Sequence, residues 1–229
     1  AGSYFRPPTL MRDDELVEPD SPDYHFTDAI GEEAVAMIDR CPADRPFFLY
    51  LAHTAPHWPL HAWEEDIARY EGRYRGGWDA LRTARHEELK HIGLFDEKWE
   101  ISPRDPDSHP WQDDPNREWE DLRMATYAAQ VEQMDRSIGR VLRAIEERGE
   151  LDSTLIMFLS DNGGCAEFLR EDGDRESWPG FYDRPTIDGR PVHVGNTPRL
   201  RPGGDQTFMS YDLPWANASN APFRLFKHW

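Results

Sequence analysis

Several features that would quickly narrow the class of this 229-residue chain are absent from its sequence. It has only two cysteines, Cys41 and Cys165, so spacing predicts no disulfide framework and leaves open whether the two pair. No apolar run is long enough to span a membrane, and no stretch has the pattern of a signal peptide. Lys- and Arg-rich runs are also absent, and the formal net charge is −18. We therefore expect no nucleic-acid partner, because binding phosphate requires a positive surface.

The hydrophobic share is small, and yet large aromatic side chains are plentiful. Hydrophobic residues make up 38% of the chain, which is low for a self-sufficient globule. The sequence nevertheless contains 9 Trp and 11 Phe, which indicate a packed interior rather than disorder. The first residue is Ala rather than Met, and we expect the chain to be a piece of a longer one.

Two units, each a helix followed by a strand, dominate the pattern. Apolar residues at helical spacing predict a helix from Thr27, as its N-cap, to about Arg40, and the run Pro46–Leu51 then predicts a buried strand. A second helix is expected from about Trp119 to Gly149, followed by the strand Leu155–Leu159. Shorter amphipathic helices are expected at 64–70 and 78–92. This alternation predicts an α/β fold with a mainly parallel sheet flanked by helices.

Two strands are too few for a stable sheet of this size. We therefore expect further strands outside the chain, so that residues 1–229 form an internal segment of one domain, incomplete at both ends.

Polar residues follow the second predicted strand directly. Asp161 and Asn162 stand where ligands gather in open α/β sheets, and their oxygens suit Ca²⁺ or Mg²⁺. Gly163 and Gly164 allow a sharp turn and a close approach of the backbone. The alternative is an ordinary Asx turn that ends a core strand.

The first predicted strand also ends in a polar loop, in which prolines flank the pair His57-Trp58. If the two strands are parallel, this loop and the Asp161-Asn162 loop emerge at the same edge of the sheet. Near the end of the chain, Lys227 lies among aromatic residues, where an amine needs an anionic partner or a route to water. A hydrogen-bonded structural histidine and a surface lysine remain the alternatives.

Together these segments resemble the sulfatase family, specifically its arylsulfatase-like members in the alkaline phosphatase superfamily. The similarity covers 24–62, 124–167 and 215–229. Its most specific parts are the segments A-P-H-W-P and S-D-N-G-G in this order and spacing, with S-N-A-P-F-R downstream.

The resemblance implies a role for four residues and a fold. Asp161 and Asn162 match ligands of the divalent ion, usually Ca²⁺ and less often Mg²⁺, His57 matches a histidine that contacts the sulfate, and Lys227 matches a lysine near the leaving-group oxygen. It also implies part of an alkaline-phosphatase-like sandwich, a sulfated small molecule or sulfated glycan as substrate, and a periplasmic or secreted parent. Oligomeric state is not implied.

Important parts of the family pattern are missing. The family's formylglycine nucleophile arises from a C/S-x-P-S/A-R motif, and neither Cys41 nor Cys165 stands in one. We expect that nucleophile and the remaining metal ligands outside this chain, which by itself should be inactive. Two alternatives remain: a phosphodiesterase or phosphonate hydrolase of the same superfamily, whose zinc or manganese sites commonly have Asp-His here, and a non-catalytic degenerate sulfatase.

Overall fold

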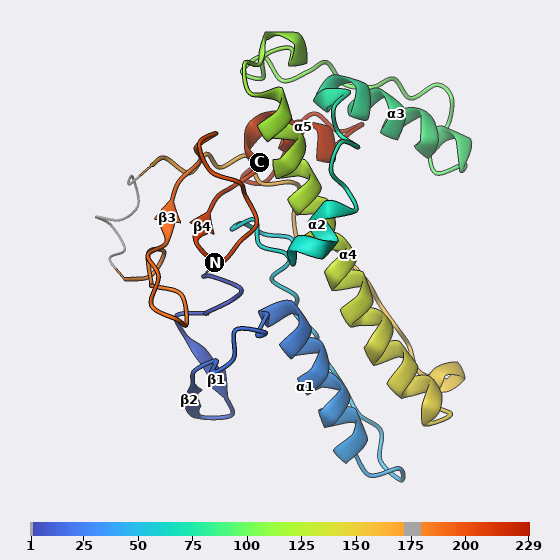
Figure 1. The fold of residues 1–229 in the computed structure, drawn as a ribbon. Helices are drawn as coiled ribbons and strands as arrows, with labels where there is room; N and C mark the ends of the chain where they lie inside the picture. Colours follow the sequence, from blue (N-terminus) through green and yellow to red (C-terminus); the bar gives the residue numbers. More distant parts are fainter. Residues whose placement is uncertain (1, 172–179) are drawn as a thin grey trace.

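The computed structural model describes residues 2–171 and 180–229, and helices dominate it (Figure 1). The helices are α1 (Phe26–Arg40), α2 (Glu64–Ala68), α3 (Gly77–His91), α4 (Arg117–Glu147) and α5 (Asp212–Ser219), with short 3-10 turns at Trp111–Asp113 and Leu151–Ser153. The strands are β1 (Leu10–Arg12), β2 (Glu15–Val17), β3 (His193–Val194) and β4 (Thr207–Phe208). No described helix combines the length and the apolar character that crossing a membrane requires.

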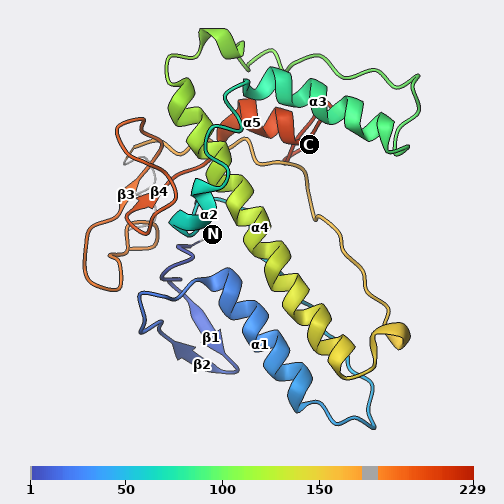
Figure 2. The same ribbon diagram turned by 45° about the vertical axis from the view of Figure 1, so that its right-hand side comes forward.

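The long helix α4 runs through the centre of the fold, and α1 lies alongside its C-terminal half (Figure 2). Ala34 and Ile38 of α1 pack against buried apolar residues of α4, as their helical spacing predicts. The two long predicted helices are confirmed, with α1 ending at Arg40 and α4 beginning at Arg117, two residues before Trp119. The shorter helices predicted at 64–70 and 78–92 are observed as α2 and α3. The N-cap differs: the His25 side chain, rather than Thr27, accepts the capping hydrogen bond.

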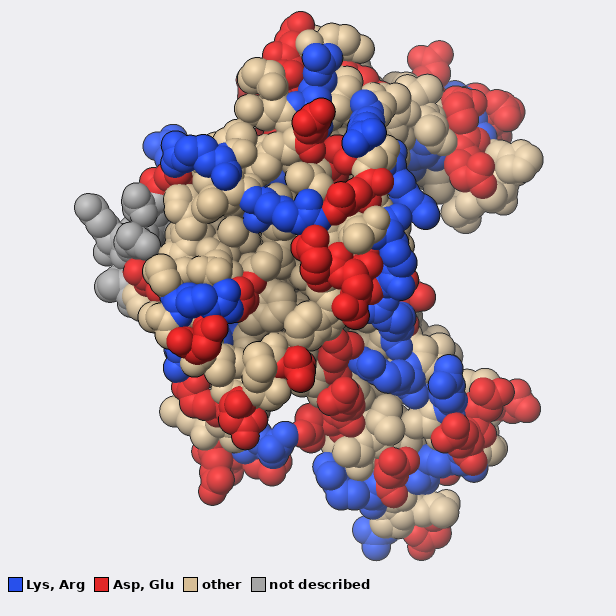
Figure 3. Space-filling view, viewed as in Figure 1, with Lys and Arg blue, Asp and Glu red and all other residues tan. Residues whose placement is uncertain are grey.

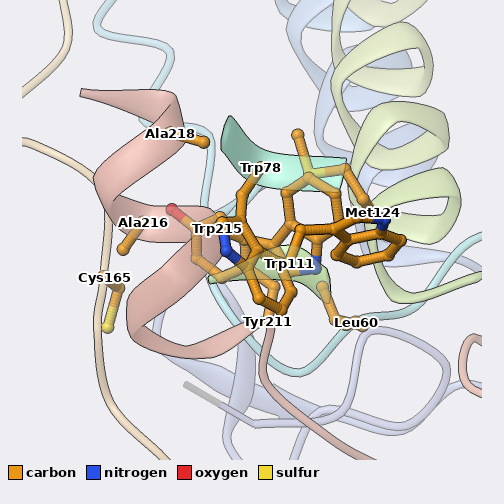
Figure 4. Close-up of a cluster of buried hydrophobic side chains, with 9 residues drawn as sticks. All are labelled: Leu60, Trp78, Trp111, Met124, Cys165, Tyr211, Trp215, Ala216 and Ala218. Carbon is orange, nitrogen blue, oxygen red and sulfur yellow. The ribbon is translucent and has the colours of Figure 1, made fainter. Parts of the chain in front are cut away.

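Tryptophans form the second core, at the N-terminal end of α4. Trp78, Trp111 and Trp215 lie almost fully buried with their rings edge to face or tilted, and Met124 of α4 closes the cluster (Figure 4). Edge-to-face pairs are favoured electrostatically, and each large ring buries much apolar surface. This cluster anchors α5, and with it the chain that leads to Lys227.

The predicted parallel sheet is not present among the described residues. The observed sheets are the antiparallel hairpin β1–β2 and a parallel pair, β3–β4, of two residues per strand. The segments Pro46–Leu51 and Leu155–Leu159 belong to no strand, so these two predicted strands are not formed and the mainly parallel sheet is not confirmed. A strand forms only where a second strand accepts its backbone hydrogen bonds, and no described segment pairs with these two as a strand.

The side chains of the first segment alternate as in a strand, whereas those of the second are all exposed. Phe47 and Leu49 pack on the α1–α4 core, whereas the intervening Phe48 is 93% exposed. Leu155 is 85% exposed, and its apolar neighbours up to Leu159 are exposed as well. Such a run of exposed apolar side chains is unusual on a soluble surface.

Acidic and basic side chains share the surface. Figure 3 shows Lys and Arg side chains with Asp and Glu side chains beside them on one face. Arg140 pairs with Asp28 at 2.8 Å, and Arg136 pairs with the buried Asp66. These pairs join α4 to α1 and to α2.

Candidate active site

His57 is fixed by hydrogen bonds on both its ring and its backbone. Its Nδ1 lies 2.8 Å from the carbonyl oxygen of Trp58, and its own carbonyl accepts a hydrogen bond from the Tyr4 hydroxyl at 3.0 Å. Because a carbonyl only accepts, Nδ1 carries the ring proton and Nε2 presents a lone pair. Burial, assisted by the nearby Lys227 charge, lowers the pKa of His57. The imidazole is therefore neutral near pH 7, with its acceptor nitrogen free for a donor.

Lys227 supplies that donor, although it is 170 residues away in the sequence. Its Nζ lies 3.1 Å from Nε2 of His57. An ammonium has three N–H donors, so two remain for an anion after one is given to His57. The structure thus brings together two of the four predicted site residues. Lys227 donates to His57, and its ammonium charge remains available for an anion.

The glycine loop lies against the same segment. The Gly164 amide donates to Oδ1 of Asn220 at 3.0 Å, and its carbonyl accepts from the Lys227 amide at 3.0 Å. A Cβ on Gly164 would lie 2.6 Å from the Tyr211 hydroxyl, and one on Gly163 would lie 2.5 Å from Asn220 Oδ1. Both glycines are therefore required by close packing against the chain that positions Lys227.

Replacing Gly164 by alanine is expected to lower the free energy of unfolding by about 1–3 kcal/mol, because the new methyl group overpacks this contact. Denaturant unfolding of the protein measures the change. Gly139→Ala is the matched control: Gly139 lies within α4, a methyl group there would meet no atom of a neighbouring element, and alanine favours helix. Equal effects of the two substitutions would contradict the packing argument.

Asp161 and Asn162 lie exposed at the start of this loop. Asn162 Nδ2 donates to Asp161 Oδ1 at 2.9 Å, and neither side chain bonds to His57 or Lys227 in the described part of the chain. Their remaining oxygens are hard donors of the type that Ca²⁺ prefers, but Ca²⁺ takes about six to eight. The described residues contain no group of three or more His, Cys, Asp or Glu arranged to hold a metal. The oxygen ligands of Asp161 and Asn162 fit Ca²⁺ in type, but these two residues supply only part of the about six to eight ligands that it takes.

Glu167 is a residue of this site that the sequence did not single out. Its Oε2 accepts from the Trp58 indole at 2.6 Å, and its Oε1 lies 2.9 Å from His228 Nε2. Burial raises the pKa of Glu167, but the hydrogen bonds from His228 and Trp58 and the charge of Lys227 outweigh it, so the pKa is lowered. A single glutamate three residues after the S-D-N-G-G segment has no local signature of a role, so no pattern in the sequence selects Glu167.

The two cysteines form no disulfide with each other. Cys41 and Cys165 are both free, which answers the question of pairing left open by the sequence. Cys165 is buried in the tryptophan cluster, and burial raises the pKa of its thiol. The thiol packs in this cluster and also lies beside Glu167.

Comparisons with known proteins show the family of the chain. The sequence model of the Sulfatase family matches residues 3–188. An uncharacterized sulfatase of Schizosaccharomyces pombe is 33% identical over 97% of this chain, which covers 39% of that protein. An arylsulfatase of Klebsiella aerogenes is 32% identical over 93% of this chain, which covers 43% of that protein.

A solved structure described as the crystal structure of Ps i-CgsB is 28% identical in sequence to this chain. The match covers 68% of this chain and 24% of the solved chain, with a TM-score of 0.41. The family assignment rests on the sequence matches. The chain spans about two fifths of the length of the two relatives above. Because the family model matches most of the chain and the two relatives are 33% and 32% identical to it, the chain belongs to the sulfatase family.

Proposed function

We propose that this chain is an internal segment of the catalytic domain of a sulfatase that hydrolyses sulfate esters. The observation that carries the proposal is the contact between Lys227 and a neutral His57, next to the glycine loop that follows Asp161 and Asn162. Family membership supports sulfuric ester hydrolysis for the parent protein.

The chemistry of the two residues suits the reaction. Cleavage of a sulfate ester places negative charge on the departing oxygen, and a fixed cationic donor stabilises that charge in the transition state. In this proposal, Lys227 binds the sulfate near that oxygen and His57 contacts the sulfate group. The hydrogen bond between them helps to orient the ammonium before the substrate arrives.

Asp161 and Asn162 are proposed as two ligands of a divalent ion, Ca²⁺ rather than Mg²⁺. When bound, that ion would hold and polarise the sulfate oxygens. The formylglycine nucleophile is proposed to lie outside this chain, together with the other ligands. The all-oxygen pair supports calcium over the nitrogen-rich zinc or manganese sites of the related phosphodiesterases.

The exposed apolar segments support the finer fold proposal, a mainly parallel sheet in an alkaline-phosphatase-like sandwich. Phe48 and Leu155 present apolar surface and unpaired backbone where neighbouring strands of a larger domain would pack. The range proposed for this domain segment, 1–229, includes residues 1 and 172–179, which lie outside the described residues. A sulfated small molecule or glycan as substrate and a periplasmic or secreted location complete the proposal.

The test is turnover by the full-length protein of an aryl sulfate and, in parallel, of an aryl phosphodiester. We expect hydrolysis of the sulfate, its loss in a calcium-selective chelator, and its return on adding Ca²⁺. Preferential hydrolysis of the phosphodiester would favour the related phosphodiesterases. Absence of both activities in folded, metal-loaded protein would favour a degenerate, non-catalytic sulfatase.

A further inference from the structure

Glu167 joins the two segments that carry His57 and Lys227. One carboxylate oxygen accepts from Trp58, the residue after His57, and the other contacts His228, the residue after Lys227. The two bonded residues are 109 and 61 positions from Glu167 in the sequence, so this one side chain ties together three separate parts of the chain.

Each partner is coupled directly to a residue of the candidate site. The Trp58 carbonyl accepts the His57 Nδ1 proton, and the two rings lie 4.8 Å apart between centroids. The Trp58 side chain thus adjoins the imidazole whose Nε2 faces Lys227, and its placement affects the space available to that ring. Trp58 also packs against Phe208, so its indole is held on one side by apolar contact and on the other by the carboxylate.

His228 needs such a partner for a second reason. Its φ of +88° lies in the left-handed region, which non-glycine residues adopt only when their surroundings hold them there. The imidazole is largely exposed, and its contact with Glu167 is the tie given by the described residues. Loss of that contact would let the backbone relax at the residue beside Lys227.

Beyond this carboxylate, Lys227 is positioned by its amide hydrogen bond to Gly164 and by the contact of its Nζ with His57. Neither fixes the long side chain by itself. We propose that Glu167 is a positioning residue that sets the distance between His57 and the Lys227 ammonium through its paired hydrogen bonds to Trp58 and His228. The proposal deepens the sulfatase function above and rests on it for its kinetic consequence, but its geometric consequence is independent of any reaction.

The geometric test uses protein labelled with ¹⁵N in its histidine rings, whose spectra report the hydrogen bonding of each ring nitrogen. His57→Gln assigns the His57 signals, and Lys227→Met gives the His57 Nε2 shift without its donor. We expect Glu167→Ala to move that shift toward the Lys227→Met value. Glu167→Gln, which still accepts from the Trp58 indole, should remain closer to wild type.

Glu171→Ala is the matched control. Glu171 lies on the same segment and also contacts a histidine and an arginine, His193 and Arg199, neither of which belongs to the candidate site. It should leave the His57 shift unchanged. If Glu167→Ala also leaves this shift unchanged while the protein remains folded, the positioning role is wrong, whatever the enzyme does.

The kinetic test is the aryl sulfate turnover of the same variants in the full-length protein. A displacement of the ammonium by about an ångström should lower kcat about 10- to 100-fold in Glu167→Ala, with KM within about 2-fold of wild type. Trp58→Phe, which keeps an aromatic ring but loses the indole N–H, should lower kcat in the same direction. Its effect and that of Glu167→Ala should combine less than additively, because both variants lose the same hydrogen bond between Trp58 and Glu167.

The two proposals fail in different ways. A wild-type protein without sulfate turnover but with the expected His57 shift in Glu167→Ala overturns the sulfatase function and keeps the positioning role. An active wild type whose kcat is unchanged in Glu167→Ala overturns the positioning role and keeps the function.

Discussion

Replacing Lys227 by alanine is expected to lower the turnover of an aryl sulfate by about 10²- to 10⁴-fold, with a much smaller change in stability. The ammonium stabilises charge that appears on the departing oxygen only as the bond breaks, so its loss falls on kcat more than on KM. In the folded protein its visible contacts are one hydrogen bond to His57 and its backbone, and the alanine variant keeps the backbone bond to Gly164.

Steady-state kinetics and thermal unfolding of the full-length protein measure both effects. Lys98→Ala is the matched control, because Lys98 is an exposed lysine paired with Asp96 outside the candidate site. It should change neither activity nor stability appreciably. If Lys227→Ala loses folded protein in proportion to activity, Lys227 is a structural residue and the catalytic assignment is wrong.

The protein should also lose stability steeply as the pH falls from about 6.5 toward 4.5. His25 and His61 are buried in an aromatic cluster with Tyr4, Phe5 and Trp63. Burial lowers the pKa of His25 to about 4 and that of His61 to about 3. Below pH 6.5 the unfolded chain binds protons at both rings while the folded chain does not, so the equilibrium shifts toward unfolding.

The expected loss is of the order of 3 kcal/mol for His25 alone across this window, since each pKa unit corresponds to about 1.4 kcal/mol. That is a large part of the stability of an ordinary domain. Carboxylates with lowered pKa, such as Asp28 and Glu167, add their own loss only at lower pH, below the unfolded-state value near 4.

His61→Gln separates this effect from the rest of the titration. Nδ1 of His61 accepts from the Tyr4 amide and Nε2 bonds to the Thr207 carbonyl, and a glutamine amide offers one acceptor and donors without titrating. The free energy of unfolding of this variant should therefore fall less between pH 6.5 and 4.5 than that of wild type. His91→Gln, at the exposed end of α3, should follow the wild-type curve. Parallel curves for all three proteins would contradict the assignment to buried neutral histidines.

Local pattern predicted the helices of this fold and failed for its sheet. The apolar spacing that places Ile38 on the buried face of α1, and Ile145 on that of α4, can be recognised within each helix alone. Both helices formed as expected. The run from Leu155 to Leu159 has the composition of a strand, but a strand also depends on a partner elsewhere in the chain, and the described residues supply none. Sheet formation is a non-local property that composition cannot establish.

The candidate site shows the same division between local and non-local information. His57 and Lys227 were predicted from their motifs, and the structure places them in contact, which no local spacing could have predicted. Asp161 and Asn162 were predicted as metal ligands, and that role stays a prediction. Glu167 was missed because its function depends on two partners far away in the sequence.

If Lys227 stabilises the departing oxygen of a sulfate ester, its contribution should depend on the basicity of that oxygen, and a series of aryl sulfates measures this dependence. Turnover by wild type and by Lys227→Ala is measured across phenol leaving groups of increasing pKa. We expect the loss of turnover in the variant to grow as the leaving group becomes more basic, because more basic oxygens carry more negative charge in need of stabilisation by the ammonium. A loss that is the same for every leaving group would contradict it, and would place Lys227 in binding the sulfate rather than in assisting the bond to break.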